Sequence, residues 1–171
     1  HAADYNIAPD RIGITGASSG GQLALSQAMD GDNGAPAAKD PVERVSSRVQ
    51  AVACFFPPTD FLNYGHPGAD ALGHGLLKGF PAPFAFSATD PVKRREIGRQ
   101  ISPIYHVTAD DPPTLIIHGE KDSLVPLQQA KTMIAKLQKT GVTARLIIKP
   151  GAGHGWPGLD QDMPKLADWF D

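Results

Sequence analysis

Short apolar stretches and amphipathic stretches alternate along most of this chain. The apolar stretches are rich in β-branched and aromatic residues, which is typical of buried strands. The amphipathic stretches contain helix-forming residues, and one of them is closed by Gly141. The pattern predicts strands at residues 12–15, 49–56, 114–118 and 144–149, and helices at residues 19–29, 126–139 and 163–170.

Strands that alternate with helices form a mostly parallel sheet flanked by helices, and this α/β class is the fold that we expect. Residues 59–113 interrupt the alternation after the second predicted strand. They contain many glycines and prolines and a predicted helix at residues 91–100, whose charged run at residues 93–96 is expected to face solvent. We therefore expect a single domain over residues 1–171 with an irregular, cap-like insertion at about residues 59–113. The insertion holds three phenylalanines that need an apolar environment, Phe80, Phe84 and Phe86.

Composition and charge exclude several classes of function. The chain has 171 residues, of which 41% are hydrophobic, and this suffices for one domain with a core. Its 16 basic and 18 acidic residues are spread along the sequence, so neither nucleic acid nor a membrane surface is an expected partner. No apolar run approaches the roughly 20 residues that cross a bilayer. The lone Cys54 is expected to be buried and inert, and it excludes an internal disulfide.

A glycine-rich turn, TGASSGG at residues 15–21, joins the first predicted strand to the first predicted helix. It matches the start of the short-chain dehydrogenase signature, in which spaced glycines bind dinucleotide phosphates. The rest of that signature is missing, because no acidic residue ends a second strand at the expected distance and no tyrosine precedes a lysine by four positions. No lysine follows the glycines as in a Walker phosphate loop. We therefore expect no nucleotide cofactor.

The same turn contains Gly16-Ala17-Ser18-Ser19-Gly20, which matches the pattern G-x-S-x-G. In this pattern a serine adopts a strained backbone conformation between a strand and a helix, so that its hydroxyl projects above the sheet. Gly16 and Gly20 are expected to supply the room that such a turn requires. The five-residue pattern is only moderately specific, but its position between a strand and a helix favours Ser18 as a nucleophile.

A serine nucleophile needs a base that takes its proton and a carboxylate that orients the base. Asp122 lies in the loop after the third predicted strand, and His154 lies in a glycine-rich loop after the fourth. Both loops leave carboxyl ends of strands, where open α/β sheets place their chemistry. The alternatives are that Asp122 only braces its turn and that His154 is an ordinary loop residue, and Asp60 is a second candidate for the acid. No spacing typical of a metal site is present.

Three segments together resemble the carboxyl-terminal half of an α/β-hydrolase. They are PDRIGITGASSGG at residues 9–21, SPIYHV with PPTLIIHGEKDSLVP within residues 102–126, and KPGAGHGW at residues 149–156. The resemblance is to the esterase and dienelactone hydrolase-like branch, which is also similar to the catalytic domain of prolyl oligopeptidases. It implies Ser18 as nucleophile, Asp122 as acid and His154 as base, and it implies the backbone N–H of Ser19 as an oxyanion-hole donor.

The chain departs from a complete member of that family at its amino end. Complete members have several strands and an oxyanion loop before the nucleophile strand, whereas this chain begins at His1, eleven residues before Ile12. We therefore expect that an upstream part is missing or is replaced by another chain. The first strand should then have an unpaired edge that favours a homo-oligomer. A second oxyanion donor should also be missing, which costs roughly 10²- to 10³-fold in rate.

The resemblance implies hydrolysis of a carboxylic ester through an acyl-enzyme, without a cofactor or metal. The implied substrates are small molecules or polysaccharide-linked esters that carry acetyl or aryl groups. Phe55, Phe56 and Pro57 are candidates for the substrate pocket, with core packing as the alternative role of the phenylalanines. Two other functions stay open: a serine peptidase of the prolyl oligopeptidase type, and a non-catalytic binding module with the same fold.

Overall fold

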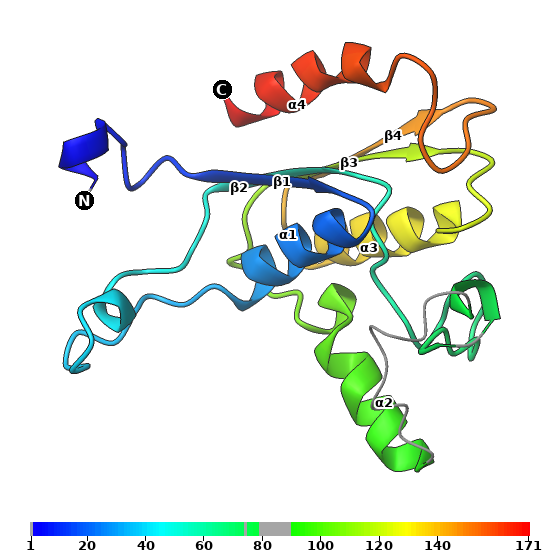
Figure 1. The fold of residues 1–171 in the computed structure, drawn as a ribbon, viewed down its shortest axis with the longest axis horizontal. Helices are drawn as coiled ribbons and strands as arrows, with labels where there is room; N and C mark the ends of the chain where they lie inside the picture. The colour runs from blue at the N-terminus through cyan, green and yellow to red at the C-terminus, as the bar shows by residue number, and fades with distance from the viewer. Residues whose placement is uncertain (1, 74, 79–89) are drawn as a thin grey trace.

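Four parallel strands form the central sheet (Figure 1). The computed structural model describes residues 2–73, 75–78 and 90–171. All three pairs of neighbouring strands are parallel, and the strands follow one another across the sheet in their order along the chain. The predicted strands and the α/β class are thereby confirmed. The strands are β1 (Gly13–Ala17), β2 (Ala51–Phe55), β3 (Thr114–Gly119) and β4 (Ala144–Lys149).

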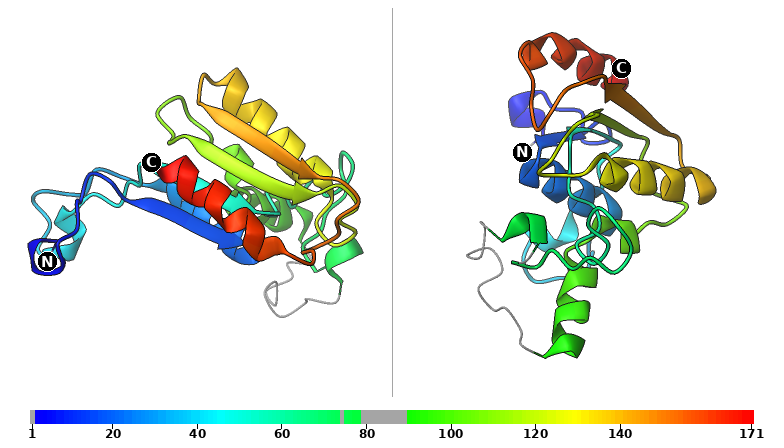
Figure 2. Two further views of the ribbon diagram at one scale, coloured as in Figure 1. Left: turned by 90° about the horizontal axis from the view of Figure 1, so that it is seen from above. Right: turned by 90° about the vertical axis from the view of Figure 1, so that its right-hand side faces the viewer.

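Helices cover both faces of the sheet. Helices α1 (Ser19–Asp30) and α3 (Leu127–Lys139) lie on one face, and α4 (Met163–Phe170) lies on the other (Figures 1 and 2). Helix α2 (Pro91–Gln100) projects from the α1 and α3 side and ends close to the 3-10 helix η5 (Pro103–Tyr105). Its N-cap Asp90 accepts a hydrogen bond from the backbone N–H of Val92. All of the predicted helices are present.

The central strands bury both of their faces, because successive side chains point to opposite sides of a strand. In β2, Val52 and Cys54 pack toward α1 and α3, whereas Ala53 and Phe55 pack toward α4. In β3, Ile116 joins the first cluster and its neighbours join the second. Cys54 is fully buried, and this burial raises the pKa of its thiol, as expected for an inert core cysteine.

The edge of the sheet at β1 carries no neighbouring strand within the part of the chain that the structure describes. Strand β1 pairs with β2 alone, and its residues alternate between exposed and partly exposed positions. The predicted unpaired edge is therefore present. Pairing of this edge with a second copy of the chain stays a prediction. Among the described helices, none has both the length and the apolarity that crossing a membrane requires.

The insertion at residues 59–113 has its own small core. Phe61, Tyr64, Leu72 and Leu77 cluster there with Val125, which lies outside the insertion. The predicted phenylalanines Phe80, Phe84 and Phe86 lie outside the described residues.

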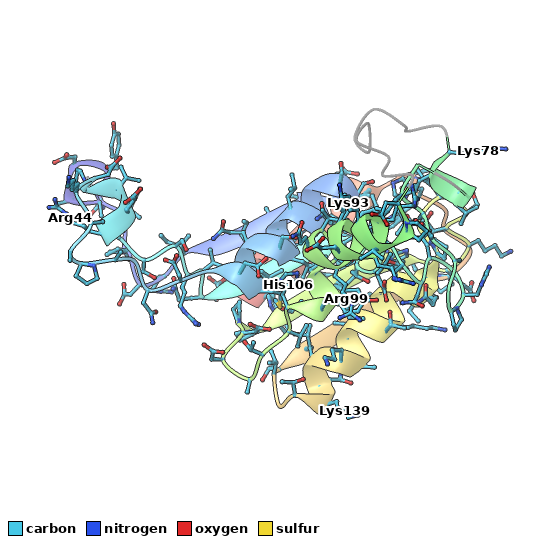
Figure 3. All side chains as sticks on the ribbon, turned by 90° about the horizontal axis from the view of Figure 1, so that it is seen from below. Arg44, Lys78, Lys93, Arg99, His106 and Lys139 are labelled. Carbon is cyan, nitrogen blue, oxygen red and sulfur yellow. The ribbon has the colours of Figure 1, made fainter. Side chains whose placement is uncertain are left out.

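Most of the charged run in α2 faces solvent, as predicted. Within the run, Lys93, Arg95 and Glu96 are exposed, and Lys93 is labelled on the side of the molecule that Figure 3 shows. The prediction is wrong for Arg94, whose side chain is 14% exposed. Its guanidinium binds the Asp70 carboxylate at 2.8 Å and also donates to the Leu72 carbonyl, so it joins α2 to the rest of the insertion.

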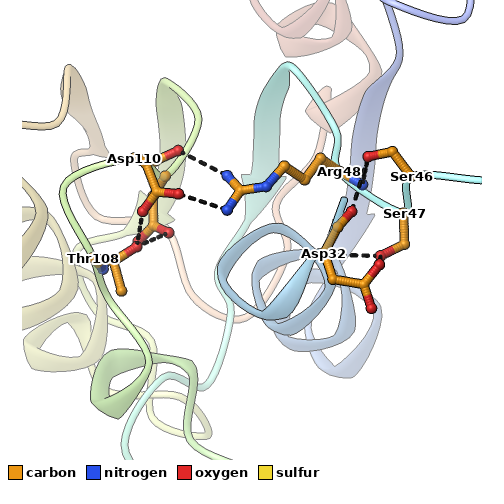
Figure 4. Close-up of polar contacts among 7 residues, drawn as sticks. Asp32, Ser46, Ser47, Arg48, Thr108 and Asp110 are labelled. Carbon is orange, nitrogen blue, oxygen red and sulfur yellow. Dashed lines mark hydrogen bonds and ion pairs between the residues drawn. The ribbon is translucent and has the colours of Figure 1, made fainter. Parts of the chain in front are cut away.

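Polar contacts join the loops at the amino ends of β2 and β3 (Figure 4). Arg48 donates to the Asp110 carboxylate at 2.5 Å, and the Thr108 hydroxyl donates to the same group at 2.7 Å. The hydrogen bond from Thr108 and those from Arg48 lower the pKa of Asp110. On the other side of Arg48, the Ser46 hydroxyl donates a hydrogen bond to the backbone carbonyl oxygen of Asp32 at 2.8 Å. These contacts lie at the end of the sheet opposite the carboxyl ends of the strands.

Two leucines of α1 test this account of the core. Leu25 is fully buried between α1 and the sheet, whereas Leu23 is 64% exposed. We expect Leu25→Ala to lower the free energy of unfolding by about 2–5 kcal/mol, because it leaves a cavity. Leu23→Ala should change it by no more than about 0.5 kcal/mol. Urea unfolding followed by circular dichroism measures both, and equal losses would contradict this assignment of the buried face.

Candidate functional site

Ser18 lies at the sharp turn between β1 and α1. Its backbone has φ 54° and ψ −122°, a conformation that residues other than glycine rarely adopt. The turn is fixed because the Ser18 N–H donates to the Phe55 carbonyl of the neighbouring strand at 3.0 Å. The serine therefore sits at a strained strand-to-helix turn, as the G-x-S-x-G pattern predicts.

The glycines around this turn differ in what they do. A Cβ atom on Gly16 would lie 2.2 Å from the Gly20 carbonyl oxygen, so this position requires glycine. A Cβ atom on Gly20 would meet nothing within 4 Å, so the prediction that Gly20 supplies room is wrong. Gly21 is the tighter position, because its Cβ atom would lie 3.1 Å from the Phe55 carbonyl oxygen. The first turn of α1 thus presents the side of Gly21, and not that of Gly20, to β2.

Asp122 lies in the loop after β3, with its side chain fully buried. One carboxylate oxygen accepts hydrogen bonds from the backbone N–H groups of Leu124 (3.0 Å) and Val125 (2.8 Å). The other oxygen lies 2.8 Å from Nδ1 of His154. The loop itself therefore orients the carboxylate, and its second oxygen is directed to the histidine.

His154 lies in the loop after β4 and is placed between Asp122 and Ser18. Its Nε2 lies 2.9 Å from the Ser18 hydroxyl oxygen, and its ring is 22% exposed. With the proton on Nδ1, the ring donates to Asp122 and accepts from the serine hydroxyl. The ring of Phe56, 4.5 Å away between centroids, packs against it. The structure thus brings together the three side chains that the sequence analysis selected.

The His154 loop approaches the end of β3 closely. A Cβ atom on Gly119 would lie 2.2 Å from the Gly153 carbonyl oxygen, so the approach depends on glycine at the end of β3. The Lys121 N–H donates to the Ala152 carbonyl at 2.8 Å, and the Gly151 N–H donates to the Glu120 carboxylate at 2.9 Å. These contacts fix the first part of the loop against β3.

A second histidine, His118, lies beside the same carboxylate. It is fully buried in β3, its Nε2 is 2.8 Å from the Val125 carbonyl oxygen, and the same nitrogen is 3.5 Å from the Asp122 carboxylate. Burial lowers the pKa of His118, against the opposing effects of the Val125 hydrogen bond and of Asp122, while nearby His154 lowers it further. The neutral ring can donate its Nε2 proton to Val125 and so brace the Asp122 loop.

Asp60, the second candidate for the acid, has other partners. It accepts hydrogen bonds from the backbone N–H groups of Leu62 and Asn63, from the Asn63 side chain and from the Tyr105 hydroxyl. Asp60 therefore braces the start of the insertion, and the His154 ring binds Asp122 instead. Among the described residues, no group of three or more His, Cys, Asp or Glu side chains is arranged to hold a metal ion.

An apolar cleft of about 370 Å³ opens beside Ser18. The insertion and the Asp122 loop form most of its walls. The sequence analysis missed this lining, because residues without regular periodicity give no signal of which side they face. The cleft is lined by Ser18, Ser19, Gln22, Leu23, Pro58, Phe61, Tyr64, Leu77, Ile101, Leu124 and Val125.

None of the predicted pocket residues Phe55, Phe56 and Pro57 is among those that line this cleft, and the two phenylalanines belong to the core of the sheet. Phe55 and Phe56 are 3% and 6% exposed and pack with Trp156 and Leu166. Phe56 has an unusual φ of 35°, which directs its ring to His154. Pro57 is buried near Gly21. The backbone N–H of Ser19 is in the first turn of α1, where such groups have no intrahelical acceptor.

A parallel sheet with a serine at a strained turn, followed by loops that bring aspartate and histidine to it, defines the α/β-hydrolase class. The chain belongs to the BD-FAE family, whose model matches residues 1–137. The resemblance to α/β-hydrolases is thereby confirmed.

Relatives and solved structures agree with this family. A probable carboxylic ester hydrolase, LipM of Mycobacterium tuberculosis, is 31% identical over 150 residues, which cover 81% of this chain and 30% of that protein. The structure of a truncated carbohydrate esterase from gut microbiota is 32% identical with a TM-score of 0.78, covering 99% of this chain and 61% of that one. The structure of an acetyl ester-xyloside bifunctional hydrolase from Caldicellulosiruptor lactoaceticus is 31% identical with a TM-score of 0.73. The match covers 98% of this chain and 56% of that one. The match covers about a third of the length of LipM and of a second relative, the esterase LipQ of the same organism.

Alanine at the two outer glycines of the motif should have opposite effects on stability. Gly16→Ala places a methyl group against the Gly20 backbone and should destabilise the fold by about 1–3 kcal/mol. Gly20→Ala fills open space in a helix and should stabilise the fold by up to about 1 kcal/mol. Thermal unfolding of the two variants distinguishes these effects. A destabilising Gly20→Ala would contradict the geometry described above.

Buried His118 predicts a loss of stability in mild acid. The unfolded chain takes up a proton near the ordinary pKa of 6.5, whereas the folded chain takes it up only at lower pH. The unfolded state therefore binds more protons below pH 6.5, and the free energy of unfolding falls as pH falls to the lowered pKa. His118→Gln should make this slope shallower by up to about 1.4 kcal/mol per pH unit. Urea unfolding at a series of pH values below 6.5 measures the slope.

The matched control for this slope is exposed His66, changed to glutamine. Because the His66 side chain is exposed and not buried in the core, this change should leave the slope as in the wild type. A His118→Gln variant with an unchanged slope would show that the buried ring does not resist protonation.

Proposed function

We propose that this chain carries the catalytic centre of a serine hydrolase that cleaves carboxylic esters. The observation that carries the proposal is the unbroken pair of hydrogen bonds from Asp122 through His154 to the Ser18 hydroxyl. In this proposal Ser18 is the nucleophile, His154 the general base and Asp122 the acid that orients the base. The family and the named relatives, which are ester hydrolases and carbohydrate esterases, support the same class of reaction.

Each step follows from these positions. Oγ of Ser18 attacks the ester carbonyl carbon, and its proton passes to Nε2 of His154, while the Asp122 carboxylate stabilises the resulting imidazolium. The backbone N–H of Ser19 donates to the carbonyl oxygen as that oxygen gains negative charge. The tetrahedral intermediate expels the alcohol, which takes the proton from Nε2 and leaves an acyl group on Ser18. Water then attacks the acyl carbon and passes its proton to Nε2 of His154. The second tetrahedral intermediate releases the carboxylic acid as Oγ of Ser18 takes that proton back.

The cleft beside Ser18 supports an ester with a compact apolar acyl group. Its walls are mostly aliphatic and aromatic, with Phe61 and Leu77 coming from the insertion. We therefore assign residues 59–113 a cap-like role in which they shape the acyl site of one α/β-hydrolase domain over residues 1–171. Acetyl or aryl esters, on small molecules or on polysaccharides, are the proposed substrates, and one similar protein is named for acetyl ester-xyloside hydrolysis.

Removal of the nucleophile tests the proposal. Ser18→Ala should abolish labelling by a fluorophosphonate probe and lower kcat on a p-nitrophenyl acetate substrate by about 10⁴- to 10⁶-fold, because the acyl-enzyme cannot form. Asp122→Asn should lower kcat by about 10⁴-fold, because the imidazole loses its orienting partner. The matched control is Ser123→Ala, an exposed serine next to Asp122.

Two results would count against the proposal. Labelling of the Ser18→Ala variant would place the nucleophile elsewhere. An unlabelled wild-type chain, tested both alone and in its parent-length protein, would favour a binding module with this fold. Comparison of p-nitrophenyl esters with peptide amides then distinguishes an esterase from a peptidase, since both would use the same three side chains.

A further inference from the structure

A buried carboxylate, Asp162, lies behind the loop that carries His154. It is 2% exposed and ends the short 3-10 helix η6 (Leu159–Asp162), directly before α4. We propose that Asp162 is a positioning residue that fixes the His154 loop from both of its ends. This inference rests on the proposed function in assigning His154 as the base.

Asp162 binds one residue on each side of the loop. Lys149 is the last residue of β4, and its ammonium group lies 3.0 Å and 2.9 Å from the two carboxylate oxygens of Asp162. Trp156 follows His154 by two residues, and its indole N–H donates to the same carboxylate at 2.9 Å. Residues 150–155 therefore run between two side chains that share one buried acceptor.

The Trp156 ring connects this acceptor to the imidazole through aromatic packing. It lies edge-on to Phe55 at 5.9 Å and to Phe56 at 5.7 Å between ring centroids. Phe56 in turn packs against the His154 ring at 4.5 Å. Because rings in close contact cannot move independently, the indole position set by Asp162 limits where the His154 ring can lie.

The loop needs such an attachment because its backbone is intrinsically free. Gly151 and Gly155 both have positive φ values, 68° and 83°, and glycine loses more conformational freedom on ordering than other residues do. The contacts with β3 hold the loop at Gly151 and Ala152, before the histidine. The bond between Trp156 and Asp162 holds it after the histidine.

The Asp162 carboxylate stays charged at every pH at which a histidine can act as a base. Burial would raise the pKa of Asp162, but hydrogen bonds from Lys165, Lys149 and Trp156 outweigh it and lower the pKa to about 2. Lys165 lies three residues later, in the first turn of α4, so its bond to Asp162 holds no part of the His154 loop. The bonds to Lys149 and Trp156 are different, because these two residues lie at the two ends of the loop, whereas Asp162 lies outside it.

Two substitutions test the anchor separately. Asp162→Asn keeps the shape of the side chain and removes the charge that faces Lys149 and Lys165. Trp156→Phe keeps an aromatic ring but replaces the indole by a smaller one and removes the N–H donor. The matched control is Asp160→Asn, which makes the same chemical change at an exposed position two residues earlier.

The first measurement is hydrogen exchange of the backbone amides of residues 149–156 in the full chain, followed by mass spectrometry. Exchange there should be faster in both variants, unchanged in the control, and unchanged in β2 and β3 in all of them. The second measurement is turnover of p-nitrophenyl acetate. We expect kcat to fall about 10- to 10²-fold with little change in KM, because a displaced base slows the chemical step and not binding. The double variant should be no slower than the slower single variant, since both remove one link.

Wild-type exchange rates at residues 149–156 in both variants would overturn the inference. A fall in kcat with equally faster exchange in β2 and β3 would also overturn it, because that pattern is general destabilisation. If the Asp162→Asn variant does not fold, the Trp156→Phe variant alone tests whether the bond to Asp162 fixes the loop. A wild-type chain that no fluorophosphonate labels contradicts the proposed function, whereas the exchange measurement still tests the anchor.

Discussion

Two hydrogen bonds in series, from Ser18 to His154 and from His154 to Asp122, impose the strictest geometric demand on this fold. They join groups as far as 136 residues apart in the sequence, and each bond tolerates only a few tenths of an ångström. The parallel sheet meets the first part of this demand, because the carboxyl ends of β1, β3 and β4 lie at one edge. The loops must meet the second part, because each of them has to fix one of the three side chains at hydrogen-bonding distance from the next.

The three loops achieve this in different ways. Ser18 is fixed by the strained backbone of the residue itself and by one hydrogen bond from its N–H to the Phe55 carbonyl of β2. Asp122 is fixed within a few residues, because the N–H groups of Leu124 and Val125 bind its carboxylate. The His154 loop is held by a turn within it, from the Ala152 N–H to the Lys149 carbonyl, and by contacts with the residues that follow β3 and with η6. The supporting contacts therefore differ in range: those of Asp122 lie within its own loop, whereas Ser18 and the His154 loop also depend on residues far along the chain.

This difference in range explains what the sequence could predict. The turn at Ser18 and the strand-loop order that leads to Asp122 are local, so the strands, the helices and the fold class followed from short patterns. The preference for Gly21 over Gly20 as the close contact depends on how α1 is rotated against β2, which a pattern of glycines does not contain. Asp162 gave no signal, because acidic residues near a helix start are common on the surface. The cleft was missed because its walls come from an irregular insertion.

Burial around Asp122 adds an electrostatic constraint to the geometric one. His118 is close enough to the Asp122 carboxylate to compete with His154 for its charge, at 3.5 Å against 2.8 Å. Desolvation keeps the His118 ring neutral, because the pKa of this fully buried histidine is lowered. A neutral ring can donate to the Val125 carbonyl without pairing with the acid. The Asp122 carboxylate then pairs with His154, whose side chain is 22% exposed and which, in the proposed mechanism, is the ring that gains a proton when Ser18 loses one.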